Sequence, residues 1–187
     1  LVQDGRTAVT ILAPPGGSYD PVAQRIADAI EKQSGTPPII ARATRPLAPS
    51  ATPHIIALGC LANNPFIETL YLRWQTLVDR WFPGTGGWVI QTYFAPMRPG
   101  QHVLLLGGSD APGVELAADQ FIKKLEAIAA PAIPWCFEVK LGESHFPLPE
   151  DRLDVLGTSP SEIASPESAL PEHNYVSGFH GGSPRNY

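Results

Sequence analysis

The sequence predicts an α/β fold of the layered α+β sandwich type, with a mixed sheet of about five or six strands, three helices and an irregular C-terminal arm. Short runs of β-branched and apolar residues alternate with longer segments in which apolar residues recur at helical spacing. Turns rich in proline and glycine separate these segments. Neither periodicity continues beyond about residue 147, so the ordered fold is expected to lie before that point.

The first two elements are predicted to be a strand and a helix. Thr7–Ala13 is rich in β-branched residues and ends at a Pro-Pro-Gly-Gly break, as strands do. Asp20 followed by Pro21 is an N-cap signal with proline at the first helical position, and Gly35 is a stop signal. The apolar residues between these signals recur every four positions: Val22, Ile26 and Ile30.

Two strands and a long helix are expected next. Pro38–Ala41 and His54–Gly59 are short apolar runs, and the second is apolar enough to be buried on both faces. Asn64 before a proline predicts a helix start. The apolar residues after it predict one helix with a wide buried stripe: Ile67, Leu70, Tyr71, Trp74, Leu77, Val78 and Trp81.

The last part of the fold is predicted to be a strand pair, a helix and a sixth strand. Trp88–Phe94 and His102–Leu106 are joined by a short link, so they should pair antiparallel. The turn Gly107–Gly113 leads into a third helix, and Trp135–Leu141 is a further strand candidate. The buried face of the third helix is predicted to contain Val114, Ala117, Ala118, Phe121, Leu125 and Ile128.

Composition limits the classes of function. The 187 residues include 43% apolar residues, enough for a core, and we expect a domain over residues 1–146. Thirteen basic and 18 acidic residues give a net charge of −5, which argues against a nucleic-acid partner. No apolar run approaches the roughly 20 residues of a membrane helix. The chain begins with Leu1 rather than Met, so we expect a processed product or part of a longer protein.

Residues 147–187 are expected to form an extended or disordered tail or linker. They are rich in Pro, Ser and Glu and contain six acidic but only two basic residues. The aromatic residues in this tail are candidates for anchoring it to a partner or to a next domain: Tyr175, Phe179 and Tyr187.

The turn Gly107–Gly113 is the first candidate site. It leaves a buried strand and enters a helix N-terminus, where free N–H groups attract anions, so Gly108, Ser109 and Asp110 are candidate ligand-binding residues. Neither a P-loop nor a dinucleotide-binding fingerprint is present. The alternative is a tight strand-to-helix turn capped by Asp110.

Ser109 is also a candidate catalytic nucleophile, because Gly-Gly-Ser-Asp-Ala is close to the nucleophile elbow G-x-S-x-G. Partners in hydrolase order follow, but all lie in the tail, where nothing is expected to hold them rigidly near the serine. They are Asp151, Asp154, His173 and His180.

The remaining charged residues and histidines indicate surface positions and no cofactor. The carboxylates outside the tail are scattered over helix faces rather than paired for glycosidase chemistry: Asp28, Glu31, Asp79, Glu115, Asp119 and Glu126. His54 and His102 begin strands and are interpreted as edge residues. No histidine or cysteine spacing indicates a metal.

Tryptophans and cysteines leave two further alternatives open. Trp88 and Trp135 are candidates for stacking on a glycan, and the alternatives are core packing or burial against a neighbouring domain. Trp74, Trp81 and Tyr93 have the same alternatives, and the spacing of the first two favours the core. Cys60 and Cys136 are expected to be buried free thiols, with a disulfide between them as the alternative.

Several motifs in fixed order resemble a known domain. They are His54–Gly59 followed by Asn63-Asn64, then Gly86-Gly87 before Trp88–Thr92, then Val103–Asp110 with Gly113-Val114. This order is similar to the α/β accessory domain that precedes the catalytic barrel in family 20 hexosaminidases and family 67 α-glucuronidases. The resemblance covers about residues 7 to 128. The helix after Asn64 is longer and more aromatic than is usual there.

The resemblance implies a non-catalytic accessory or scaffolding domain of a secreted or periplasmic carbohydrate-active protein. That family's catalytic residues lie in a following barrel, so none is carried over, and no activity is expected in this chain alone. Its partner would be a neighbouring catalytic or structural domain, with a glycan as a further candidate. Two alternatives remain: a self-assembling extracellular structural protein that uses the tail and aromatic surface, and a serine hydrolase at Ser109.

Overall fold

A computed structural model shows a six-stranded mixed sheet with three helices, which confirms the predicted α/β fold. The structure describes residues 2–3, 6–44, 53–128, 132–133 and 135–143. The tail predicted for residues 147–187 lies outside these residues. Of the described helices, none combines the length and apolar character that crossing a membrane requires.

The elements follow the predicted order, with one small addition at the start. A two-residue pair, β1 (Val2–Gln3) and β2 (Arg6–Thr7), precedes the main sheet. The strands of the main sheet are β3 (Val9–Ala13), β4 (Ile39–Arg42), β5 (His54–Gly59), β6 (Trp88–Phe94), β7 (His102–Gly108) and β8 (Phe137–Lys140). The helices are α1 (Asp20–Ser34), α2 (Pro65–Leu72) and α3 (Ala111–Ala127).

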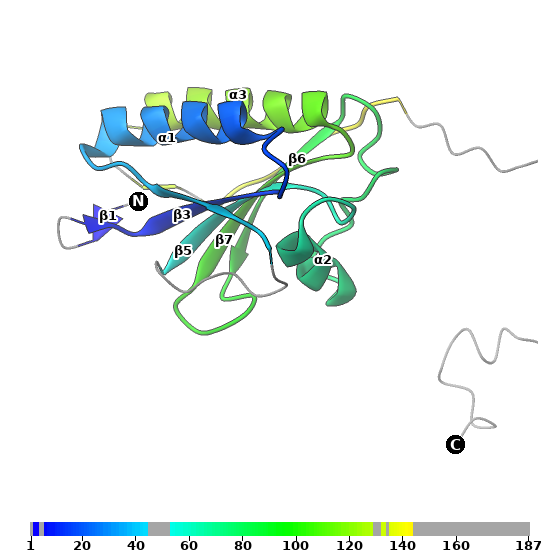
Figure 1. The fold of residues 1–187 in the computed structure, drawn as a ribbon, viewed down its shortest axis with the longest axis horizontal. Coiled ribbons are helices and arrows are strands. Elements are labelled where there is room, and N and C mark those ends of the chain that lie inside the picture. Colours follow the sequence, from blue (N-terminus) through cyan, green and yellow to red (C-terminus); the bar gives the residue numbers. More distant parts are fainter. Residues whose placement is uncertain (1, 4–5, 45–52, 129–131, 134, 144–187) are drawn as a thin grey trace, which may run out of the picture. The chain divides into compact units, whose positions relative to one another are not determined.

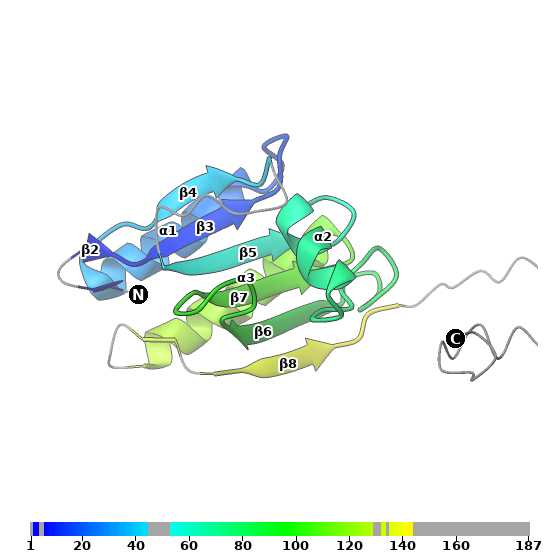
Figure 2. The ribbon, with the colours of Figure 1, turned by 90° about the horizontal axis from the view of Figure 1, so that it is seen from below.

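The sheet has the strand order β4-β3-β5-β7-β6-β8 (Figure 2). The first four of these strands are parallel, and β6 is antiparallel to both β7 and β8. The short link between β6 and β7 therefore makes an antiparallel pair, as the sequence predicted. The carboxyl ends of the parallel strands share one edge, where the loops carrying Ser109 and Asn64 begin.

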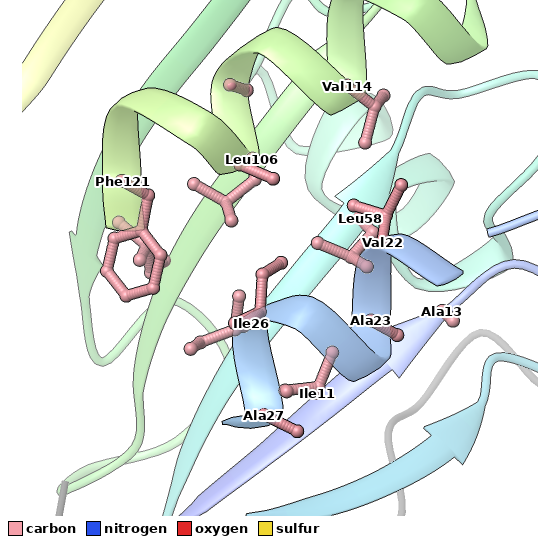
Figure 3. Packing of buried hydrophobic residues seen from close by; sticks show 14 of the residues in the cluster. Ile11, Ala13, Val22, Ala23, Ile26, Ala27, Leu58, Leu106, Val114 and Phe121 are labelled. Atoms are coloured by element: carbon pink, nitrogen blue, oxygen red, sulfur yellow. The ribbon is translucent and has the colours of Figure 1, made fainter. Parts of the chain in front are cut away.

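Helices α1 and α3 lie side by side on one face of the sheet (Figure 1). Between them and the strands lies an apolar cluster in which Ile26, Leu58, Leu106 and Phe121 interlock (Figure 3). The predicted stripe of α1 is buried, and Gly35 ends the helix in the left-handed conformation at φ +72°. Asp20 is the first helical residue rather than the N-cap, and it pairs with Arg42 instead.

The opposite face is covered in part by α2, which lies near the carboxyl ends of the strands (Figures 1 and 2). A second cluster fills this side, with Phe66 and Leu70 of α2 against Leu105 of β7. Asn64 is fully buried and caps α2, since its Oδ1 accepts from Phe66 N at 3.0 Å. Its Nδ2 donates to Leu12 O and Leu58 O, which joins the cap to β3 and β5. The predicted N-cap is confirmed.

Candidate functional site

In the Gly107–Gly113 turn, the Asp110 carboxylate accepts hydrogen bonds from nearby backbone N–H groups. Asp110 Oδ1 accepts a hydrogen bond from Gly113 N at 2.8 Å and caps α3. Its Oδ2 accepts from Gly86 N at 3.0 Å, which ties the preceding loop to the helix start. Both oxygens are therefore engaged at the helix N-terminus, where an anionic ligand would otherwise be attracted.

Ser109 is likewise engaged with backbone. Its Oγ accepts from Gly84 N at 3.0 Å. The two described histidines, His54 and His102, lie at the starts of β5 and β7, whereas Ser109 follows the end of β7. The length of β7, roughly 20 Å for seven residues, separates them from the serine. The four proposed triad partners lie outside the described residues.

Five glycines explain why this region is dense rather than hollow. A Cβ on Gly113 would lie 2.2 Å from Gly87 O, and one on Gly108 would lie 2.6 Å from Val114 N. A Cβ on Gly142 would lie 2.1 Å from Thr85 O. The helix start, the loop and the chain after β8 thus touch backbone to backbone. We call Gly84, Gly87, Gly108, Gly113 and Gly142 the glycine cluster.

The two glycines before β6 have different roles. Gly86 has a positive φ, of +67°, whereas Gly87 does not. Gly87 is required by space, because its Cβ would lie 2.5 Å from Gly142 N and 2.7 Å from Pro83 O. Gly108 and Gly113 are required by space as well, since a Cβ on either would meet neighbouring backbone.

The tryptophan candidates do not converge on one site. Trp88 is half-buried at the start of β6, where it pairs with Gly108 and packs on the apolar cluster under α3. Trp135 is 64% exposed and lies near Thr92 and Phe94, at the other end of β6. The five candidate ligand-binding residues are therefore divided between the two ends of this strand.

A cavity of about 250 Å³ lies near Trp135, at the amino ends of β5 and β7. His54 and His102 line it with their rings stacked at 5.1 Å and 9°, and Phe94 meets the second imidazole edge-on at 5.3 Å. Burial lowers the pKa of His54, and the nearby His102 lowers this pKa further. The sequence placed these histidines at strand starts correctly, but contained no signal that they stack.

The structure changes the prediction for the residues after Asn64. Helix α2 ends at Leu72, so the long helix predicted up to Trp81 is wrong. Gln75 N donates to Leu70 O and Trp74 N to Tyr71 O, which is the Schellman ending of a helix. Trp74 occupies the left-handed position of that motif, at φ +59°, where glycine is usual.

The chain after α2 therefore turns large apolar side chains outward. We call residues 72–81 the aromatic segment. Its exposed side chains are Leu72 at 71%, Trp74 at 88%, Leu77 at 57% and Trp81 at 46%. The core assignment of the two tryptophans is thus wrong, and their exposure leaves burial against a neighbouring domain or stacking on a glycan as the alternatives.

Buried residues fix the aromatic segment to the fold. Val78 is 1% exposed and packs over Gly107, where a Cβ would lie 2.9 Å from its Cγ1. Asp79 Oδ1 accepts from Trp81 N at 2.7 Å and from Phe82 N at 2.8 Å. The carboxylate that the sequence placed on a helix face is thus a turn-forming group.

Two other carboxylates form surface ion pairs, and the cysteines are free thiols. Asp119 and Glu126 form surface ion pairs with Arg25 and Lys32, at 2.9 and 3.4 Å. Among the described residues, no three metal-binding side chains come together. Cys60 and Cys136 are free thiols and belong to clusters on opposite faces of the sheet. The structure therefore does not support a disulfide between them. Burial raises the pKa of the Cys60 thiol.

Comparison with known proteins adds no assignment, since no family model and no curated protein matches this chain.

Proposed function

We propose that this chain is a non-catalytic accessory domain that docks onto a neighbouring protein domain through the aromatic segment, residues 72–81. The observation that carries the proposal is the outward display of four large apolar side chains by a segment whose centre is fixed in the core. Exposed apolar patches of this kind are typical of interaction sites, and tryptophan is enriched among the residues that dominate binding.

The aromatic segment is preorganised for docking. Arg73 and Gln75 donate to Pro96 O at 3.4 and 3.5 Å, which ties the helix end to the loop after β6. Thr76 and Val78 are buried between the exposed side chains. A partner would therefore bind side chains whose backbone is already ordered, which reduces the entropy lost on binding.

The strained conformation of Trp74 supports the same proposal. A non-glycine residue in the left-handed region costs about 1 kcal/mol or more, and the hydrogen bonds around Leu70 and Tyr71 hold it there. Such strain is found preferentially at functional positions. With 88% of it exposed, this side chain has little contact with the described part of the domain.

The carbohydrate-active context comes from the resemblance to the accessory domains of family 20 hexosaminidases and family 67 α-glucuronidases. With it come a neighbouring catalytic domain as the partner and a secreted or periplasmic location. The engagement of Ser109 and Asp110 with backbone donors is compatible with a domain that has no chemistry of its own.

The test is hydroxyl-radical footprinting, at low micromolar concentration, of this chain alone and of the native polypeptide that contains it. We expect oxidation of Trp74 to fall several-fold in the longer polypeptide. Trp135, 64% exposed and outside the aromatic segment, is the internal control and should stay reactive. Equal oxidation of Trp74 in both, or a native polypeptide with no further domain, would show that the proposal is wrong.

A glycan-stacking role is separated by fluorescence. Titration of the isolated chain with oligosaccharides should leave tryptophan emission unchanged if the segment docks onto protein. A saturable change that disappears in Trp74→Ser would instead assign the segment to sugar binding and overturn the docking proposal.

A further inference from the structure

Strand β8 forms an edge of the sheet (Figure 2). It carries exposed apolar side chains. Among the described residues it pairs only with β6. Phe137 and Val139 stand opposite Gln91 and Val89, on the α2 face of the sheet, and are 56% and 37% exposed. Leu141, just beyond the strand, is 69% exposed. This edge is neither shielded by charge on that face nor covered by a described element.

The ladder between β6 and β8 determines which backbone groups of β8 point away from the other described strands. Thr92 N donates to Cys136 O at 2.9 Å, which marks a hydrogen-bonded pair in the β6–β8 ladder. Such pairs recur at every second residue of an antiparallel ladder. The N–H and C=O groups of Glu138 and Lys140 therefore face β6, and those of Phe137 and Val139 face the open edge.

We propose that β8 pairs antiparallel with β8 of a second copy of this chain, with Val139 on the two-fold axis. In this register each Val139 exchanges two backbone hydrogen bonds with the partner's Val139. Glu138 stands opposite the partner's Lys140, and Phe137 stands opposite the partner's Leu141. Both apolar and charged side chains thus meet their complements, and the sheet continues through both copies.

Charge selects this register over its neighbours. Centring the two-fold axis on Glu138 or on Lys140 would place like charges directly opposite each other, which is destabilising. Neither centre would use the outward-facing backbone of Val139 on the axis. Centring it on Phe137 would form no pair of opposite charges. Only the Val139 register satisfies the backbone, the apolar face and the charges together.

Self-pairing at β8 does not rest on the proposed docking function, because it uses another part of the surface. The aromatic segment lies after α2, while β8 is an edge strand of the sheet. The contact is short, so the dimer is expected to be weak and to depend on concentration. Each proposal can therefore fail without the other.

The test is analytical ultracentrifugation of the full chain from micromolar to millimolar concentration. Wild type should dimerise with rising concentration. Glu138→Lys and Lys140→Glu should each raise the dissociation constant about tenfold, because each places like charges opposite each other twice. Mixing the two variants should restore association as a heterodimer, since one copy then carries two lysines and the other two glutamates. The double variant should also dimerise.

Matched controls separate edge pairing from general charge effects. Glu138 forms an ion pair with Lys124 at 2.6 Å, and Glu126 forms one with Lys32 at 3.4 Å away from the edge. Glu126→Lys should therefore leave the dimer unchanged. Val139→Pro removes the outward N–H without removing a bond to β6 and should abolish the dimer.

Three results would overturn the inference. One is a wild-type chain that stays monomeric at millimolar concentration. This result counts against the inference even if the Val139 amide is protected from hydrogen exchange, because another segment of the same chain would then cover the edge. A second is equal weakening by Glu126→Lys. The third is a mixture of the two charge variants that forms no heterodimer.

Discussion

The glycine cluster and the aromatic segment both lie near the carboxyl ends of the parallel strands. The composition of the first predicts a reactive site and that of the second predicts a buried core, and neither prediction describes the structure. The first contains a serine, an aspartate and a glycine-rich turn, the usual components of a reactive site. In the structure these groups bind backbone, with Ser109 accepting from Gly84 N and Asp110 from Gly86 N and Gly113 N. The second has core composition and core spacing, yet displays Trp74 to solvent.

This difference shows that residue type indicates what a group can do, while its neighbours decide what it does. A polar side chain that meets backbone donors becomes part of the scaffold. An apolar side chain on a segment that cannot remain helical becomes part of the surface. The proposed interaction surface of this domain therefore consists of exposed apolar groups and does not include its polar motif.

The sharpest test of the glycine cluster is Gly113→Ala. Helix propensity alone would make alanine in α3 stabilising by about 1 kcal/mol. The new Cβ would however lie 2.2 Å from Gly87 O and 3.0 Å from Asp110 Oδ1, so we expect a loss of about 3 kcal/mol of unfolding free energy. Urea unfolding followed by circular dichroism measures the change.

Gly35→Ala is the control for this substitution. Gly35 has φ +72°, and a Cβ added there would have no atom within 4 Å, so alanine adds backbone strain without a clash. We expect a loss of about 1 kcal/mol. A Gly113→Ala variant as stable as wild type would show that the helix start and the loop are not in contact.

Much of the fold could be predicted because its signals are local. Asn64 and Asp110 act as caps, and Gly35 ends α1. The alternation of strand and helix patterns predicts which segments become strands of the sheet. The tiny β1–β2 pair had no pattern of its own. The stacking of His54 on His102 joins residues 48 positions apart and depends on strand register, which the sequence does not state.

The end of α2 could not be predicted, because no glycine or proline lies between Leu72 and Phe82 to mark it. The apolar spacing from Ile67 to Trp81 is helical throughout, so local preference favours continuation. Tertiary contacts decide otherwise: Val78 fills the space over Gly107, and its carbonyl accepts from Leu61 N at 3.0 Å. Burial of this residue in the sheet's second cluster outweighs helix propensity.

Trp74 is the strained residue of the aromatic segment, with a φ of +59°. Trp74→Gly should raise the free energy of unfolding by about 1 kcal/mol, because glycine adopts the left-handed C′ position without strain. The same variant should lose docking, since the exposed indole is removed. Thermal unfolding and the footprinting assay measure the two effects.

Trp81→Gly is the matched comparison, because Trp81 is exposed but not at a left-handed position. It should not raise stability. A destabilised Trp74→Gly variant would show that the indole packs within the domain, and the contrast between a scaffold-like polar turn and a surface-like apolar segment would then fail.

The smallest expected effect separates a scaffold role for Ser109 from a catalytic one. Ser109→Ala removes the acceptor for Gly84 N in a half-buried position, so the unfolding free energy should fall by about 1 kcal/mol. Ser18, which is exposed in the loop before α1, is the control, and Ser18→Ala should leave stability unchanged. If Ser109 were the nucleophile of a hydrolase, the intact chain would cleave a p-nitrophenyl ester and Ser109→Ala would abolish that cleavage. A loss of stability with no esterase activity to lose places this serine with the glycine cluster, as a group that fixes the loop before β6 to the start of α3.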